Sequence, residues 1–120
     1  MPLNVADGIV DPASLKDRPE EFLIFYSDVV EGKMWCPDCR KVDELVRETF
    51  AGPDAPAAVI VYVGNKPEWK ALDNKFRGEP FKIDGVPTIV RLKEKEEVGR
   101  LVDDEISSKL SAFVEGSKNV

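Results

Sequence analysis

The two cysteines of the chain are Cys36 and Cys39, and two residues, Pro37 and Asp38, separate them. Thiols at this spacing can close a disulfide with each other, so the pair can take up and release two electrons. From Cys39 onward, apolar side chains recur at intervals of three and four residues, which predicts a helix. Pro37 suits the first position of that helix, so Cys36 is expected at its N-terminus, where free N–H groups and the helix dipole favour a thiolate.

This placement predicts different roles for the two thiols. Cys36 is the candidate attacking thiolate, with a sulfur left accessible by the preceding loop. Cys39 falls on the helix face of Val42 and Val46, which points it toward the core as the candidate resolving thiol. The carboxylate of Asp38 opposes ionisation of its neighbours, because like charges repel, and the balance of these effects stays open.

Composition limits the class of protein. The 120 residues suit one domain over residues 1–120, and 42% hydrophobic residues suffice for one core. A net charge of −6 makes a poor match for nucleic acid or an anionic membrane. No apolar run approaches the length of a membrane span, and the N-terminus lacks the pattern of a signal peptide. We therefore expect a cytoplasmic protein. In the reducing cytosol a Cys-x-x-Cys pair is typically redox-active.

The numbers of cysteines and histidines disfavour a metal site. A structural zinc site uses four Cys or His ligands, and the chain has two Cys and no His. We expect neither a metal nor a bound cofactor.

The elements that must position the cysteines follow from the apolar pattern. A run from Phe22 to Tyr26 predicts a strand before the motif, and a polar loop fills residues 27–33. A short helix is expected after Asp11, with Pro12 at its first position. The remaining expectations are helices at 37–50, 67–77 and 103–115, the last ended by Gly116, and strands at 57–63, 86–92 and 97–102. This order predicts an α/β fold, a mixed central β-sheet flanked by helices on both faces.

Pro87 stands at the head of an expected buried strand, where proline cannot donate to the ladder. A trans proline at a strand entry is the ordinary explanation. However, a strand, Cys-x-x-Cys at a helix start and a later Val86-Pro87-Thr88 before a hairpin resemble the thioredoxin fold. That resemblance implies a cis bond at Pro87, packed against the active-site cysteines, and a backbone that Val86, Pro87 and Thr88 present to an incoming peptide.

A narrower resemblance covers about residues 20–92. The motif Trp35-Cys36-Pro37-Asp38-Cys39 resembles that of the thioredoxin domain-containing protein 17 family, the thioredoxin-related proteins of 14 kilodaltons. The further stretches that resemble this family are Val46-Arg47-Glu48, Val63 to Lys70 followed by Asp73 to Arg77, Val86-Pro87-Thr88 and the lengthened loop before the cysteines. Thioredoxins carry a buried acid in the strand before the motif. Residues 22–26 hold none, so Asp38 or water would accept the proton of Cys39.

The resemblance implies a protein-disulfide reductase active in cell redox homeostasis. It implies that Cys36 attacks, Cys39 resolves, and electrons come from NADPH through thioredoxin reductase. Its partners would be disulfides in proteins or small molecules. The acidic loop with Asp28 and Glu31 is expected to narrow the range of protein substrates. Trp35 is either a platform beside the thiol or a half-exposed packing residue, and we favour the platform.

Two alternatives remain. A glutaredoxin-like, glutathione-dependent reductase shares Cys-Pro-x-Cys, but Trp35 precedes the motif and Glu94-Lys95-Glu96-Glu97 stands where a Gly-Gly turn is expected. A redox-gated binding module for a partner protein would use the same fold without turnover.

Overall fold

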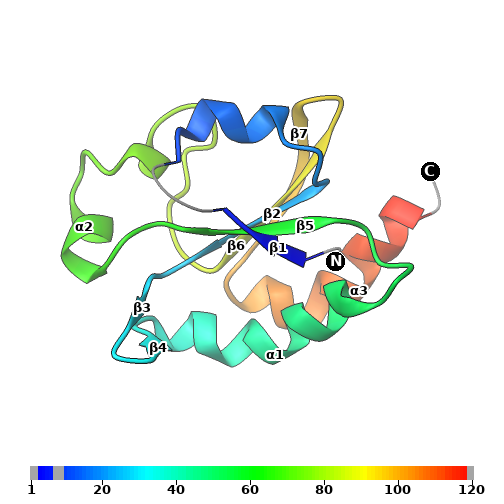
Figure 1. Ribbon diagram of the computed structural model, residues 1–120, viewed down its shortest axis with the longest axis horizontal. Helices are drawn as coiled ribbons and strands as arrows, with labels where there is room; N and C mark the ends of the chain where they lie inside the picture. The colour runs from blue at the N-terminus through cyan, green and yellow to red at the C-terminus, as the bar shows by residue number, and fades with distance from the viewer. Residues whose placement is uncertain (1–2, 7–9, 119–120) are drawn as a thin grey trace.

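A five-stranded sheet, in the order β1-β5-β2-β6-β7, forms the centre of the molecule (Figure 1). The computed structural model describes residues 3–6 and 10–118. β1, β5 and β2 run parallel, while β6 is antiparallel to β2 and to β7. The sheet is therefore mixed, as the sequence predicts. Its strands are β1 (Leu3–Val5), β2 (Phe22–Tyr26), β5 (Ala58–Tyr62), β6 (Thr88–Lys93) and β7 (Glu96–Val102).

Helices cover both faces of the sheet. α1 (Pro37–Ala51) and α3 (Asp104–Lys118) lie together on one face, below the sheet in Figure 1. The other face is covered by the 3₁₀ helix η1 (Pro12–Asp17), by α2 (Lys66–Lys70) and by the 3₁₀ helix η2 (Lys75–Arg77). The predicted α/β architecture is confirmed.

Strand alternation divides the core into two layers. On β2, Phe22, Ile24 and Tyr26 pack toward α1 and α3, while Leu23 and Phe25 pack toward η1, α2 and η2. All five side chains are fully buried, because a central strand of a covered sheet buries both of its faces. The C-terminal end of β2 leads to Ser27, which bonds to Cys36 and so joins this buried strand to the segment that carries the cysteines.

Local sequence signals explain the helix starts. The Asp11 side chain accepts a hydrogen bond from the Ala13 N–H (3.2 Å), so the predicted cap of the short helix is confirmed. Pro37 is the first residue of α1, as predicted, and Cys36 is its N-cap. α2 begins with a capping box between Asn65 and Glu68, in which each side chain accepts from the other's backbone N–H.

The structure differs from the predicted elements in four places. The loop 27–33 contains a small hairpin, formed by β3 (Val29–Val30) and β4 (Lys33–Met34). β1 is an additional edge strand that pairs with β5. The predicted helix over 67–77 is two separate turns, because Asn74 caps η2 and donates to the carbonyls of Val63 and Glu68. α3 continues past Gly116 to Lys118.

Candidate active site

The site lies where the hairpin β3–β4 leads into α1. The carbonyl of Cys36 accepts the hydrogen bond of the Arg40 N–H (3.2 Å), so Cys36 already belongs to the first turn. Its side chain makes no capping hydrogen bond to the helix backbone. The sulfur therefore does not cap the helix, and it lies at the positive end of a helix of 15 residues.

Both cysteines are free thiols, and they differ in burial. Cys39 is fully buried and packs with Val42 and Val46, as its helix face predicts. Cys36 is 7% exposed, so its sulfur is less accessible than the sequence suggests, although it remains the more exposed of the two. A substrate disulfide must therefore come close to the rim of the site before the Cys36 sulfur can attack it.

The pKa of Cys39 is raised to about 12. Burial is the largest cause, and the neighbouring Cys36 adds to it. Hydrogen bonds from the backbone and side chain of Ser27 act in the opposite direction and lower the pKa. At neutral pH Cys39 is therefore a protonated thiol that must lose its proton before it can attack.

Ser27 is a buried polar residue that contacts both cysteines. It follows β2 directly and is fully buried. Its Oγ accepts a hydrogen bond from the Cys36 N–H at 3.2 Å. The sequence interpretation passed over Ser27, because one serine in a polar loop carries no signal until the fold places it beneath the cysteines.

The loop at Pro87 lies against Cys36. The Val86–Pro87 peptide bond is cis, as the resemblance implies. The Cys36 thiol donates a hydrogen bond to the Val86 carbonyl, with Sγ and O 3.6 Å apart. The Pro87 carbonyl accepts from the Asp103 N–H (2.9 Å), and the Thr88 hydroxyl donates to the Gly85 carbonyl (2.6 Å). The fold thus unites Cys36, Cys39, Val86, Pro87 and Thr88, which the sequence assigns to one site.

Trp35 is anchored beside Cys36. Its indole Nε1–H donates to the Gly64 carbonyl at 3.0 Å, and its backbone N–H donates to the Asp28 carbonyl. The half-buried ring packs against both core layers. Gly64 has a φ of +124°, and a Cβ there would lie 2.9 Å from the Cβ of Glu68, so this position requires glycine.

Asp28, which the sequence places in an acidic loop, has a structural role. Its Oδ1 accepts a hydrogen bond from the Gly64 N–H at 2.9 Å, and its own N–H donates to the Gly64 carbonyl. Asp28 therefore joins the loop before the cysteines to the end of β5.

Asp38 meets a second carboxyl group at the start of α1. Burial raises the pKa of Asp103, and the charge of Asp38, the charge of Asp104 and a hydrogen bond with Asp38 raise it further. The Asp38 side chain therefore approaches the junction of β7 and α3.

Tyr26 lies behind the thiols. Within the described part of the chain, its buried hydroxyl has no hydrogen-bond partner. Burial raises the pKa of Tyr26, and the nearby carboxylate of Asp43 raises it further. Tyr26 is thus a neutral group at every physiological pH.

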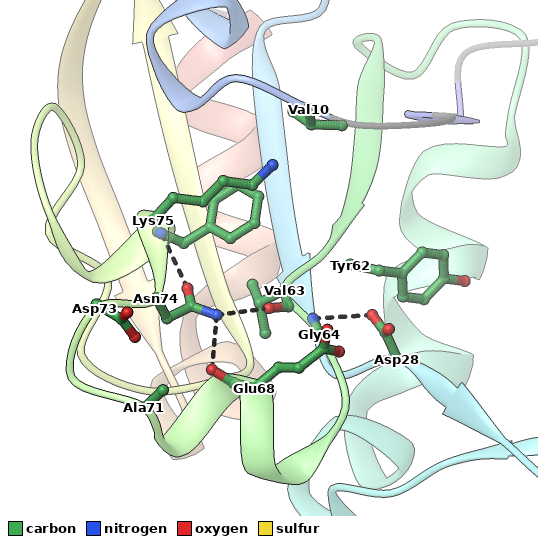
Figure 2. Close-up of a pocket in the computed structure, with 11 residues that line it drawn as sticks. Val10, Asp28, Tyr62, Val63, Gly64, Glu68, Ala71, Asp73, Asn74 and Lys75 are labelled. Atoms are coloured by element: carbon green, nitrogen blue, oxygen red, sulfur yellow. Dashed lines mark hydrogen bonds between the residues drawn. The ribbon is translucent and has the colours of Figure 1, made fainter.

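A hollow of about 580 Å³ opens on the other side of Gly64 (Figure 2). Tyr62 and Asp28 stand at one end of it, and Asn74 spans its floor with hydrogen bonds to Val63 and Glu68. Three carboxylates and one lysine line it, namely Asp28, Glu68, Asp73 and Lys75. Gly64, whose carbonyl accepts the hydrogen bond of the Trp35 indole, also lines this acidic hollow.

Two further observations bear on the kind of site. Among residues 3–6 and 10–118, no group of three or more His, Cys, Asp or Glu side chains is arranged to hold a metal ion. Over the same residues, no helix is long and apolar enough to cross a bilayer.

Comparison with known proteins adds the family context. Residues 10–115 match the family described as "Thioredoxin domain-containing protein 17-like, thioredoxin domain". Thioredoxin domain-containing protein 17 of Danio rerio is 36% identical over 88 residues, which cover 72% of this chain and 68% of that protein. The thioredoxin-like protein Clot of Oryza sativa is 32% identical over 104 residues, 78% of this chain and 75% of that protein.

Solved structures agree on the fold. A thioredoxin pre-protein of Schistosoma mansoni, solved in its reduced form, superposes with a TM-score of 0.64 at 22% identity, covering 95% of this chain and 96% of its own. Thioredoxin f2, in complex with ferredoxin:thioredoxin reductase, gives a TM-score of 0.66 at 17% identity, covering 97% and 94%.

Proposed function

The chain belongs to the thioredoxin domain-containing protein 17-like family, and from this premise and the geometry of its thiols we propose that it is a thiol-disulfide oxidoreductase that works as a disulfide reductase. One observation carries the proposal. Two free thiols lie within one turn at the start of α1, with Cys36 against the carbonyl that precedes cis-Pro87.

The reaction transfers two electrons from the protein to its substrate. The Cys36 thiolate attacks one sulfur of the substrate disulfide, forms a mixed disulfide and releases the other sulfur as a thiolate. Cys39 then loses its proton and attacks the Cys36 sulfur. The Cys36–Cys39 disulfide forms, and the second substrate sulfur leaves as a thiolate. Both substrate sulfurs are reduced and both protein thiols are oxidised.

The electrostatics of Cys39 support this order of events. In the reduced protein, the charge of Cys36 helps to hold the pKa of Cys39 near 12. That charge disappears when Cys36 enters the mixed disulfide, whereas the hydrogen bonds from Ser27 can remain. Cys39 therefore becomes easier to deprotonate at the stage that needs its thiolate. The proton acceptor in this proposal is Asp38 or water.

We propose further that electrons come from NADPH through thioredoxin reductase, without a cofactor bound to this chain, and that the protein acts in the cytoplasm. The support is the Trp35-Cys36-Pro37-Asp38-Cys39 motif with its family resemblance, since Cys-x-x-Cys pairs of the reducing cytosol are typically redox-active.

A stoichiometric experiment tests the central proposal. Reduced protein is mixed with a model disulfide, quenched in acid and alkylated, and its free thiols are counted by mass spectrometry. We expect loss of both thiols together with release of two equivalents of substrate thiol. Retention of both free thiols under conditions in which a thioredoxin is oxidised would rule out the reductase.

A further inference from the structure

A second hollow, of about 290 Å³, lies between the hairpin β3–β4 and α1. Lys33 and Met34 of β4 form one wall, and the side chains of Arg40, Asp43 and Arg47 on α1 form the other. Tyr62 closes the end and also borders the acidic hollow described above.

The charge of this second hollow is opposite to that of the chain. Lys33, Arg40 and Arg47 contribute three positive charges, and Asp43 contributes one negative charge, which leaves a local excess of two. The chain as a whole carries a net charge of −6. A local concentration of positive charge on an acidic protein attracts an anionic group to this hollow.

The positive charge is only partly neutralised within the protein. Both Asp43 oxygens lie within hydrogen-bond distance of Arg47 Nε, at 3.1 and 2.9 Å. Among the described residues, Lys33 and Arg40 have no ion-pair or hydrogen-bond partner for their side chains, and both are exposed. Their charged groups are free to meet an anion that enters the hollow.

The hollow is close to the attacking thiol. β4 ends at Met34, two residues before Cys36, and the Arg40 N–H bonds to the Cys36 carbonyl. Side chains on a helix lean toward its N-terminus, so Arg40 extends back over the turn that begins at Cys36. Asp38 lies about 200° around the helix from Arg40. An acidic substrate group is therefore drawn to the hairpin side and repelled from the Asp38 side.

We propose that this hollow is a specificity subsite, which rests on the function proposed above, and that it binds an acidic side chain of a peptide substrate two residues from the substrate cysteine. The spacing follows from geometry. Arg40 lies four residues, about 6 Å, along α1 from Cys36. An extended peptide advances about 6.6 Å in two residues and returns its side chain to the same face.

Exposed apolar surface beside the hollow favours a peptide as the ligand. Val29 and Val30 on the hairpin are 52% and 44% exposed. Apolar contacts next to a charged pocket match a peptide that carries one acidic side chain among neutral neighbours.

The test uses symmetrical peptide disulfides that differ only in Glu or Gln two residues from the cysteine. The measured quantity is the rate constant for loss of free thiols from the reduced protein at low ionic strength. We expect the Glu peptide to react about two- to fivefold faster than the Gln peptide, as for one or two exposed charge pairs. The net charge of −6 predicts the opposite order, so the sign of the difference is decisive.

Variants locate the effect. The double variant Lys33→Gln, Arg40→Gln should reduce the Glu-to-Gln ratio to about one, while Arg40→Lys should keep most of it. Asp43→Asn should raise the ratio, because it removes the carboxylate that neutralises Arg47. Lys70→Gln removes an exposed positive charge on α2, outside the hollow, and serves as the matched control.

The outcomes separate the two proposals. Equal reaction of both peptides, or a preference for Glu that survives the double variant, would overturn the subsite and leave the reductase intact. Failure of both peptides and of a model disulfide to oxidise the protein would overturn the reductase and the subsite together.

Discussion

The Ser27 hydroxyl accepts the backbone N–H of Cys36 at 3.2 Å, and hydrogen bonds from the same residue lower the pKa of Cys39. One buried side chain thus contacts the backbone of the attacking residue and the sulfur of the resolving one. Strand β2 holds no acidic residue, and Ser27, directly after this strand, supplies a polar group beneath the thiols.

Ser27→Ala should therefore slow resolution of the mixed disulfide. Without the hydroxyl, the pKa of Cys39 rises further, and the pH at which resolution becomes fast moves upward. The unsatisfied Cys36 N–H should cost about 1–3 kcal/mol in the free energy of unfolding. Rapid-quench kinetics across pH and urea unfolding measure the two effects. Ser108→Ala, on the exposed face of α3, is the control, and an unchanged pH profile would remove Ser27 from the mechanism.

The two cysteines should fail in different ways when replaced. Cys36→Ser removes the attacking group and should abolish reduction of any disulfide. Cys39→Ser should still attack, but it cannot resolve, so it should accumulate a mixed disulfide that a non-reducing gel displays. Trapping of substrates by Cys36→Ser and not by Cys39→Ser would reverse the assigned roles.

The source of electrons can be tested by NADPH consumption. We expect steady consumption with thioredoxin reductase and a model disulfide, and little with glutathione plus glutathione reductase, because Trp35 precedes the motif and Glu94-Lys95-Glu96-Glu97 replaces a Gly-Gly turn. The Cys36→Ser variant provides the background rate. Sustained turnover with glutathione alone would favour the glutaredoxin-like alternative.

Asp38→Asn should speed alkylation of Cys36 at neutral pH, since it removes a negative charge that opposes the thiolate. It should also lower the pKa of Asp103, which the Asp38 charge and hydrogen bond help to raise. Iodoacetamide kinetics in a Cys39→Ser background measure the first effect. Glu44→Gln, exposed on the same helix, is the control. An unaltered alkylation rate would mean that Asp38 acts on Asp103 alone.

The reduced protein should lose stability in alkali. The pKa of Cys39 is about 12 in the fold against 9.0 for its reference value. Above pH 9 the unfolded chain releases this proton while the folded chain keeps it, so the free energy of unfolding falls as pH rises toward 12. The raised pKa of Tyr26 acts in the same direction. Denaturant unfolding at several pH values should show a shallower decline for Cys39→Ser, and parallel curves would contradict the assignment.

The sequence predicts the elements whose signals are local. Phe22–Tyr26 is a run of strand-forming residues, and Pro37 marks the start of α1 regardless of tertiary contacts. Cys36 and Cys39 follow from spacing alone. The cis bond at Pro87 required the family resemblance, because a trans proline suits the same position.

The features that the sequence does not predict depend on partners distant in the chain. Leu3–Val5 becomes a strand only by pairing with β5. The break after Lys70 depends on Asn74, whose side chain bonds to Val63 and Glu68. Leu72 is 95% exposed there, against the helical pattern. Ser27 and Asp28 gain their roles from Cys36 and Gly64, and no spacing rule links those positions.

The hydrogen bond between Trp35 and Gly64 also gives the molecule an internal optical probe. The chain has two tryptophans. Trp69 is buried in the core layer that η1, α2 and η2 cover. The guanidinium carbon of Arg77 lies 4.0 Å from the centroid of its ring. Trp35 is held next to Cys36 by its Nε1–H, and disulfides quench indole emission at short range. We therefore expect the intensity of Trp35 emission to report thiol oxidation, and replacement of Trp69 by Phe would leave a label-free, single-fluorophore sensor of the redox state.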